Sequence, residues 1–137
     1  MKIRSFMIAD DVARGEGGKV FIHGGTLTEI EAAAFPHVHP RLAVFATVET
    51  DKGDADVTFS VAVLDSDGRP ISPPMGGMVD VSTVEDAPLP AQVNLLLTIQ
   101  GAVFPEPGLY WFALTIDDQE VDRVPLVATA PPDTDAD

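Results

Sequence analysis

Two histidines separated by one residue are the sharpest chemical feature of this sequence. His37 and His39 flank Val38, so in an extended segment both imidazoles lie on the same side of the chain and within reach of one metal ion. Two ligands do not complete a site, and the third would have to be His23 or a carboxylate brought in by folding. The pair is a candidate metal site; two structural histidines in a surface loop are the alternative.

Asp65 and Asp67 form a second candidate, in a turn that ends at Gly68. Loops at the end of a β-structure can assemble hard oxygen ligands for calcium. The carboxylates that could join them are Asp51, Asp54 and Asp56. A tight turn explains the same residues, because aspartate caps its own turn and glycine accepts a positive φ. Both readings remain open.

Catalytic motifs are missing from the sequence. There is no cysteine, so thiolate nucleophiles and sulfur-bound metal centres are excluded. The serines lack a Gly-x-Ser-x-Gly elbow. Gly15, Gly17 and Gly18 are not followed by the Gly-Lys-Ser/Thr of a phosphate loop, and a turn is the better interpretation. We therefore expect neither an enzyme nor a bound cofactor.

The formal net charge of −14 bears on the partners. Binding to phosphates needs clustered lysine and arginine, and only eight basic residues are scattered along the chain. We expect no nucleic acid and no membrane as partner. No apolar run reaches the ~18 residues of a membrane span, and the first residues do not form a secretory signal. With no cysteines to form disulfides, a cytoplasmic location is expected.

Period-two alternation predicts an all-β fold. In residues 55–64 Val57, Phe59, Val61 and Val63 alternate with polar residues, and residues 91–100 repeat the pattern. Such segments are typical of half-buried antiparallel strands. Further strands are expected over residues 2–10, 19–30, 41–49, 108–117 and 120–128, with a weak edge strand near 78–84. Gly24-Gly25 interrupts the segment 19–30 and suggests a bulge there. About eight strands with regular turns predict an antiparallel two-sheet sandwich, with a partly open barrel as the alternative.

The domain organisation follows from the same pattern. Residues 1–128 are expected to form a single β-sandwich domain, and residues 129–137, rich in proline and aspartate, an acidic disordered tail. The single helical candidate covers residues 28–35, where glutamates and alanines precede Pro36. Pro125 removes one ladder donor, which favours a sheet edge or a bulge at that point.

Several segments together resemble a known family. Met7-Ile8-Ala9-Asp10-Asp11 is followed by Gly18-Lys19-Val20-Phe21-Ile22-His23-Gly24-Gly25, and later by Leu64-Asp65-Ser66-Asp67-Gly68-Arg69-Pro70 and Pro107-Gly108-Leu109-Tyr110-Trp111-Phe112. This order is similar to that of an uncharacterised bacterial family, common in actinobacteria, that is a domain of unknown function. The resemblance implies an immunoglobulin-like fold and no activity or site residues.

Two strands are apolar on both faces. If Tyr110 and Phe112 face the core, Leu109 and Trp111 point away from it, and Phe45 is similarly left outside its strand. A loop could cover these residues, either 72–81 or 32–35, or a partner could. We expect a non-enzymatic interaction module that self-associates or binds a protein through Trp111, Leu109 and Phe45. The alternative is a small-ligand- or metal-binding domain that uses loops at one end.

Overall fold

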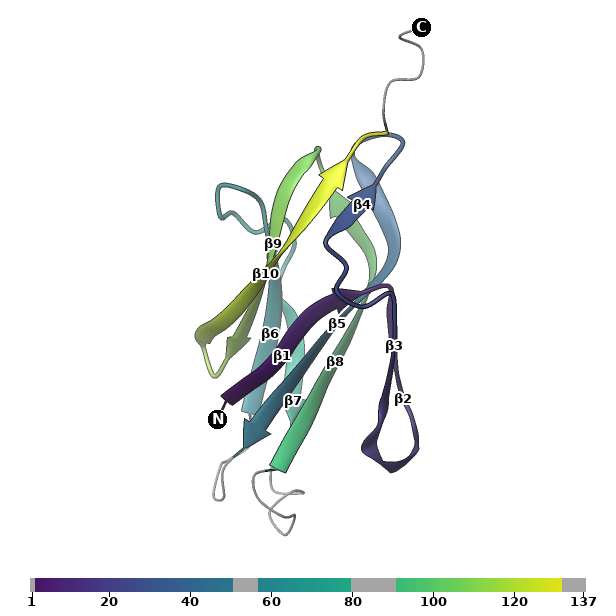
Figure 1. Cartoon of the computed structure of the whole chain (residues 1–137). Helices are drawn as coiled ribbons and strands as arrows, with labels where there is room; N and C mark the ends of the chain where they lie inside the picture. Colours follow the sequence, from purple (N-terminus) through teal and green to yellow (C-terminus); the bar gives the residue numbers. More distant parts are fainter. Residues whose placement is uncertain (1, 51–56, 80–90, 132–137) are drawn as a thin grey trace, which may run out of the picture.

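The computed structural model describes residues 2–50, 57–79 and 91–131, and this part of the chain is nearly all β-structure (Figure 1). A single 3-10 turn, η1, covers Glu16–Gly18. The strands are β1 (Lys2–Ala9), β2 (Asp11–Arg14), β3 (Val20–His23), β4 (Glu29–Glu31), β5 (His37–Thr50), β6 (Val57–Leu64), β7 (Met75–Val79), β8 (Ala91–Phe104), β9 (Gly108–Ile116) and β10 (Gln119–Thr129). The all-β class expected from the alternation is confirmed.

The strands form several sheets rather than one. A three-stranded sheet has the order β1-β5-β8, a five-stranded sheet has the order β4-β10-β9-β6-β7, and β2 and β3 form a separate hairpin. The five-stranded sheet curls strongly around the core (Figure 1). Its β9 strand pairs with both β10 and β6 in antiparallel register, with Phe112 opposite Val124 and Val63. Alternating side chains on these strands define one inner and one outer face.

One hydrophobic core lies between the two larger sheets. The three-stranded sheet contributes Ile8, Leu42, Val44 and Leu95, and the five-stranded sheet contributes its own buried row: Val61, Val63, Phe112, Leu114 and Leu126. At one end of the core the ring of Tyr110 packs edge-on against Phe104, at 5.0 Å between centroids. The expected inner faces of β5 and β9 are therefore confirmed.

The structure corrects the helix expected over residues 28–35. This segment contains β4, which pairs in parallel with the end of β10. The amide of Val127 donates to the carbonyl of Thr28, and the amide of Ala32 donates to the carbonyl of Thr129. These bonds hold the segment extended and bury Ile30, so packing overrides the local helix propensity of the alanines. This pair also departs from the purely antiparallel arrangement that the sequence predicted.

The strand expected over residues 19–30 with a bulge at Gly24-Gly25 is also corrected, because the chain divides there into two separate strands, β3 and β4. Gly24 adopts a φ of 61°, in the region that favours glycine, and the chain turns there. Pro125 lies on the part of β10 that precedes the pairing with β4, where its missing N–H leaves no ladder bond unmade.

Some expectations fall on residues outside the described ranges. They include Asp51, Asp54 and Asp56, residues 80–84 of the expected edge strand at 78–84, and residues 132–137 of the expected acidic tail. Residues 78 and 79 of the expected edge strand are the end of β7. Within the described part of the chain, no helix is long and apolar enough to cross a membrane. The single-domain organisation stays a prediction.

A substitution in the core between the two sheets tests the packing of the fold. Phe112 is fully buried there, so Phe112→Ala should lower the free energy of unfolding by about 3–5 kcal/mol, because it removes apolar contacts and leaves a cavity. Val121→Ala, on an exposed site of β10, should change it by no more than about 0.5 kcal/mol. Urea denaturation measures both, and equal losses would contradict the packing.

Candidate functional site

The β2–β3 hairpin covers the outer face of the three-stranded sheet. Val12 and Val20 pack on Ala43 and Phe45 there, and Phe45 is only 7% exposed. Asp11 and the guanidinium of Arg41 on β5 form an ion pair at 2.8 Å. The prediction of Phe45 as an interface residue is therefore wrong. The covering element is this hairpin, and neither of the two loops that the sequence suggested.

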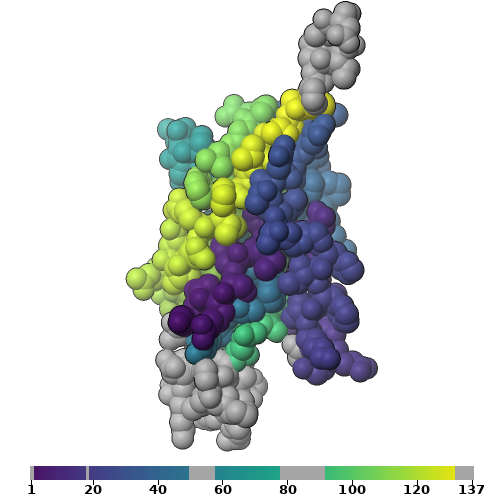
Figure 2. All heavy atoms as spheres, in the orientation of Figure 1, coloured from purple at the N-terminus to yellow at the C-terminus, as the bar shows by residue number. Residues whose placement is uncertain are grey.

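The opposite face of the hairpin points to solvent. Cross-strand pairs alternate between the two faces, so the Ala13–Phe21 pair faces away when Val12 packs inward. Phe21 is 58% exposed. Its ring lies over the α-carbon of Gly15, where a methyl group would come within 2.5 Å of the ring. Lys19 and Glu16 lie at the exposed turn that joins the strands, and Figure 2 shows the hairpin as a ridge along one side of the molecule.

The two histidines come together as the sequence predicted. His37 Nε2 and His39 Nδ1 are 3.1 Å apart, and the rings meet edge to face with centroids 5.3 Å apart. They lie at the start of β5 opposite Phe104 and Ala102 of β8. His23, the third histidine, is exposed and lies opposite Asp11 at the end of the hairpin. Among the described residues no group of three metal-ligating side chains converges.

The pKa of His39 is lowered by its surroundings. Partial burial lowers the pKa of His39 below its ordinary value of 6.5, the neighbouring His37 lowers that pKa further, and the carboxylate of Asp10 acts in the opposite direction. Asp10 follows β1 directly, and its carboxylate lies against Gly24. The His39 imidazole is therefore held in its neutral, ligand-competent form at neutral pH.

At the candidate calcium site of Asp65 and Asp67, the Asp65 carboxylate is used in hydrogen bonds within the turn. Asp65 Oδ1 accepts hydrogen bonds from the amides of Asp67 and Arg69, each at 2.9 Å. The amide of Gly68, whose φ is 82°, donates to the Asp65 carbonyl. The turn alternative accounts for these residues. The aspartates expected to complete a calcium site, Asp51, Asp54 and Asp56, lie outside the described residues.

Trp111 and Leu109 lie on the outer face of the five-stranded sheet, whereas Phe45 lies on the outer face of the three-stranded sheet. Leu109 is directly opposite Val127 on β10, and both are exposed. The guanidinium of Arg123 lies over the Trp111 ring at 5.8 Å from its centroid and also binds the Glu120 carboxylate. The three predicted interface residues therefore do not form one patch.

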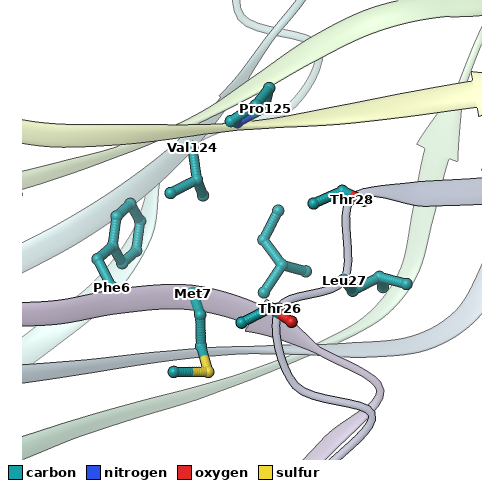
Figure 3. A pocket seen from close by; sticks show the side chains of 8 residues that line it. Phe6, Met7, Thr26, Leu27, Thr28, Val124 and Pro125 are labelled. Carbon is teal, nitrogen blue, oxygen red and sulfur yellow. The ribbon is translucent and has the colours of Figure 1, made fainter.

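Two small hollows lie where the sheets meet. One, of about 170 Å³, opens between β1 and β10 and is closed at one end by residues 26–28 (Figure 3). Its lining is Phe6, Met7, Ile8, Thr26, Leu27, Thr28, Val124 and Pro125. The second, of about 180 Å³, lies beside Gly101 on β8 and Ile71. Neither is large enough for a drug-sized ligand, which needs roughly 300 Å³ or more.

Phe21 and Lys19 are the residues that sequence reasoning missed. The sequence contained a signal for the two faces. Val12 is followed by Ala13 and Val20 by Phe21, so in paired strands the valines lie on one face and Ala13 and Phe21 on the other. A hairpin turn was expected at residues 14–18, but residues 11–14 were not assigned to a strand, so the two faces of the hairpin were not recognised.

The shifted pKa of His39 predicts how stability depends on pH. Below pH 6.5 the unfolded chain takes up a proton at His39 that the folded protein resists, so stability should fall as the pH drops from 6.5 to the lowered folded pKa and level off below it. Urea denaturation across this range should show a smaller fall for His39→Gln than for the unchanged protein. His23→Gln is the matched control. Identical pH profiles for all three proteins would contradict the environment assigned to His39.

A search of curated proteins finds no match for this chain. Among solved structures, it is similar to Pseudomonas fluorescens alkylpurine DNA glycosylase AlkC bound to DNA containing an abasic site analog, with a TM-score of 0.55 and 12% sequence identity. The alignment covers 94% of this chain and 30% of the glycosylase, so the chain spans about a third of that protein. At this identity the likeness concerns the fold.

This likeness corrects the expected partners. The sequence predicted a homo-oligomer or a protein partner and excluded nucleic acid, whereas the similar solved structure is that of a protein bound to DNA. Net charge alone was therefore an insufficient reason to exclude that class. The resemblance to a domain of unknown function is confirmed, because a family model matches residues 4–129: the chain belongs to DUF6941, a family of unknown function.

Proposed function

We propose that this domain is a non-catalytic binding module whose contact element is the β2–β3 hairpin and whose ligand is single-stranded DNA. The observation that carries the proposal is the exposed ring of Phe21 on a two-stranded ribbon, two residues after the exposed cation Lys19. Aromatic side chains on exposed β-structure stack on unpaired bases, and nearby cations bind the phosphates. The solved structure of similar fold, in which the protein is bound to DNA, supports this class of ligand.

The charge distribution limits how this contact works. The hairpin, residues 11–23, contains Arg14 and Lys19 against Asp11 and Glu16, a net charge of zero in a chain of −14, and Asp11 is paired with Arg41 of β5. Arg14 also donates to the backbone carbonyl of Asn94 at 3.4 Å. With at most two cations at the contact, stacking contributes most of the affinity and phosphate contacts contribute little. A contact with one aromatic ring and few cations suits a single strand better than a duplex. The bases of a duplex are already stacked on each other, and its higher charge density calls for more cations.

The scaffold that we propose for this module is an immunoglobulin-like two-layer sandwich. The shared core of the three- and five-stranded sheets supports it. A second support is Tyr110, whose hydroxyl donates to the carbonyl of Glu106 at 2.6 Å, since a tyrosine bonded to the backbone a few residues upstream is a hallmark of such sandwiches. A chain with no cysteine suits a reducing compartment, and we propose the cytoplasm.

Fluorescence anisotropy with a short labelled single strand of mixed sequence tests the proposed function. Phe21→Ala should weaken binding by roughly 5- to 150-fold, the range expected for loss of one base–aromatic stack. Phe21→Tyr should retain most of the affinity, because it keeps an aromatic face. The slope of log K against log salt should lie between about −0.7 and −1.4, which corresponds to one or two cations on a single strand.

The matched control is Val121→Ala, which removes an exposed apolar side chain from β10, away from the hairpin. It should leave DNA affinity unchanged. An affinity that is the same for Phe21→Ala as for the unchanged protein, or no measurable binding at low salt, would refute the assignment.

A further inference from the structure

We propose that His37 and His39 form a bidentate binding site for Cu²⁺, with water in the remaining coordination positions. The site is separate from the exposed face of the hairpin and goes beyond the proposed DNA contact. It rests on the mutual geometry of the two imidazoles, and its test uses the metal alone. Failure of one proposal therefore leaves the other intact.

The distance between the two facing nitrogen atoms fits ligation of one ion. His37 Nε2 and His39 Nδ1 are 3.1 Å apart. Imidazole nitrogens bind first-row metals at about 2.0–2.1 Å, so this separation corresponds to an angle of about 95–100° at the metal. Neighbouring ligands in a tetragonal site are close to a right angle. The two rings meet edge to face with centroids 5.3 Å apart, so both imidazoles lie together at the start of β5.

The surroundings keep both nitrogens available. The two facing nitrogens share one hydrogen in a hydrogen bond, and when both rings are neutral that hydrogen can reside instead on the remote nitrogen of its ring. Ligation at the facing pair then needs a change of tautomer and no charged ring. The strand register fixes the spacing, since His37 and His39 lie opposite Phe104 and Ala102 of β8.

The electrostatic environment favours a cation. Asp10 lies close enough to His39 to act on its charge, and it is held beside Gly24 at the end of β1. A nearby carboxylate attracts a divalent ion by its charge, and among the described residues Asp10 does not join the two histidines as a third ligand. The nearest cation on the same strand, Arg41, is paired with Asp11.

The choice of Cu²⁺ follows from the number of ligands. No third ligating side chain joins the pair among the described residues, so the protein supplies two nitrogen atoms. With so few ligands the ion of highest intrinsic affinity for imidazole binds best, and in the divalent first-row series this is Cu²⁺. A structural zinc site needs four ligands, which this pair does not offer.

Isothermal titration of the full chain with a copper(II) salt, in a buffer that does not chelate copper, tests the proposal. One ion per chain should bind, and His37→Asn and His39→Asn should each lower the affinity by roughly tenfold or more. Changes in the outer shell of a metal already cost about 10–100-fold, and loss of a ligand costs at least as much. His23→Asn is the matched control and should bind copper as the unchanged protein does.

Electron paramagnetic resonance of the copper-loaded unchanged protein gives a readout that does not depend on variants. Hyperfine coupling to two imidazole nitrogens supports the site. Coupling to one nitrogen or to none overturns it, as does copper affinity that survives in both His37→Asn and His39→Asn or is lost in His23→Asn. Circular dichroism of each variant verifies that the fold is retained.

Discussion

Burial of Phe45 by the β2–β3 hairpin is the contact on which the functional surfaces of this protein depend. The strand β5 is apolar on both faces, and its outer face needs a cover. Val12 and Val20 provide it from within the chain. Because side chains alternate along a strand, docking these two valines directs Phe21 to solvent.

The same docking organises the end of the three-stranded sheet. The amide of Asp10 donates to the carbonyl of His23 at 3.0 Å, so the start of β2 and the end of β3 are closed against each other. This places the Asp10 carboxylate in electrostatic range of His39. One apolar contact therefore orients the exposed aromatic face of the hairpin and brings the Asp10 carboxylate near the histidine pair, whose spacing is set by the pairing of β5 with β8. An acidic chain can present such local surfaces, since net charge describes the whole molecule and contact chemistry depends on a few residues.

Much of the scaffold follows from periodicity alone. The inner faces of β5 and β9 were predicted correctly because every second residue shares one face of a strand, which groups Val44 with its large apolar neighbours on β5 and Phe112 with those on β9. Short elements were missed because their partners are distant in sequence: β4 exists through pairing with Val127, which no local signal near Glu29 reveals. The histidine pair was predicted because its spacing is local. The cover of Phe45 was not, because it depends on tertiary docking.

The most direct test of this account is a nuclear Overhauser measurement on the isotope-labelled protein in solution. The account predicts contacts between the Phe45 ring and the methyl groups of Val12 and Val20, together with contacts between the Phe21 ring and Gly15. A Phe45 ring with no contact to either valine, or a Phe21 ring in contact with the face of β5, would contradict it. In that case the exposed surface assigned to the hairpin would be wrong.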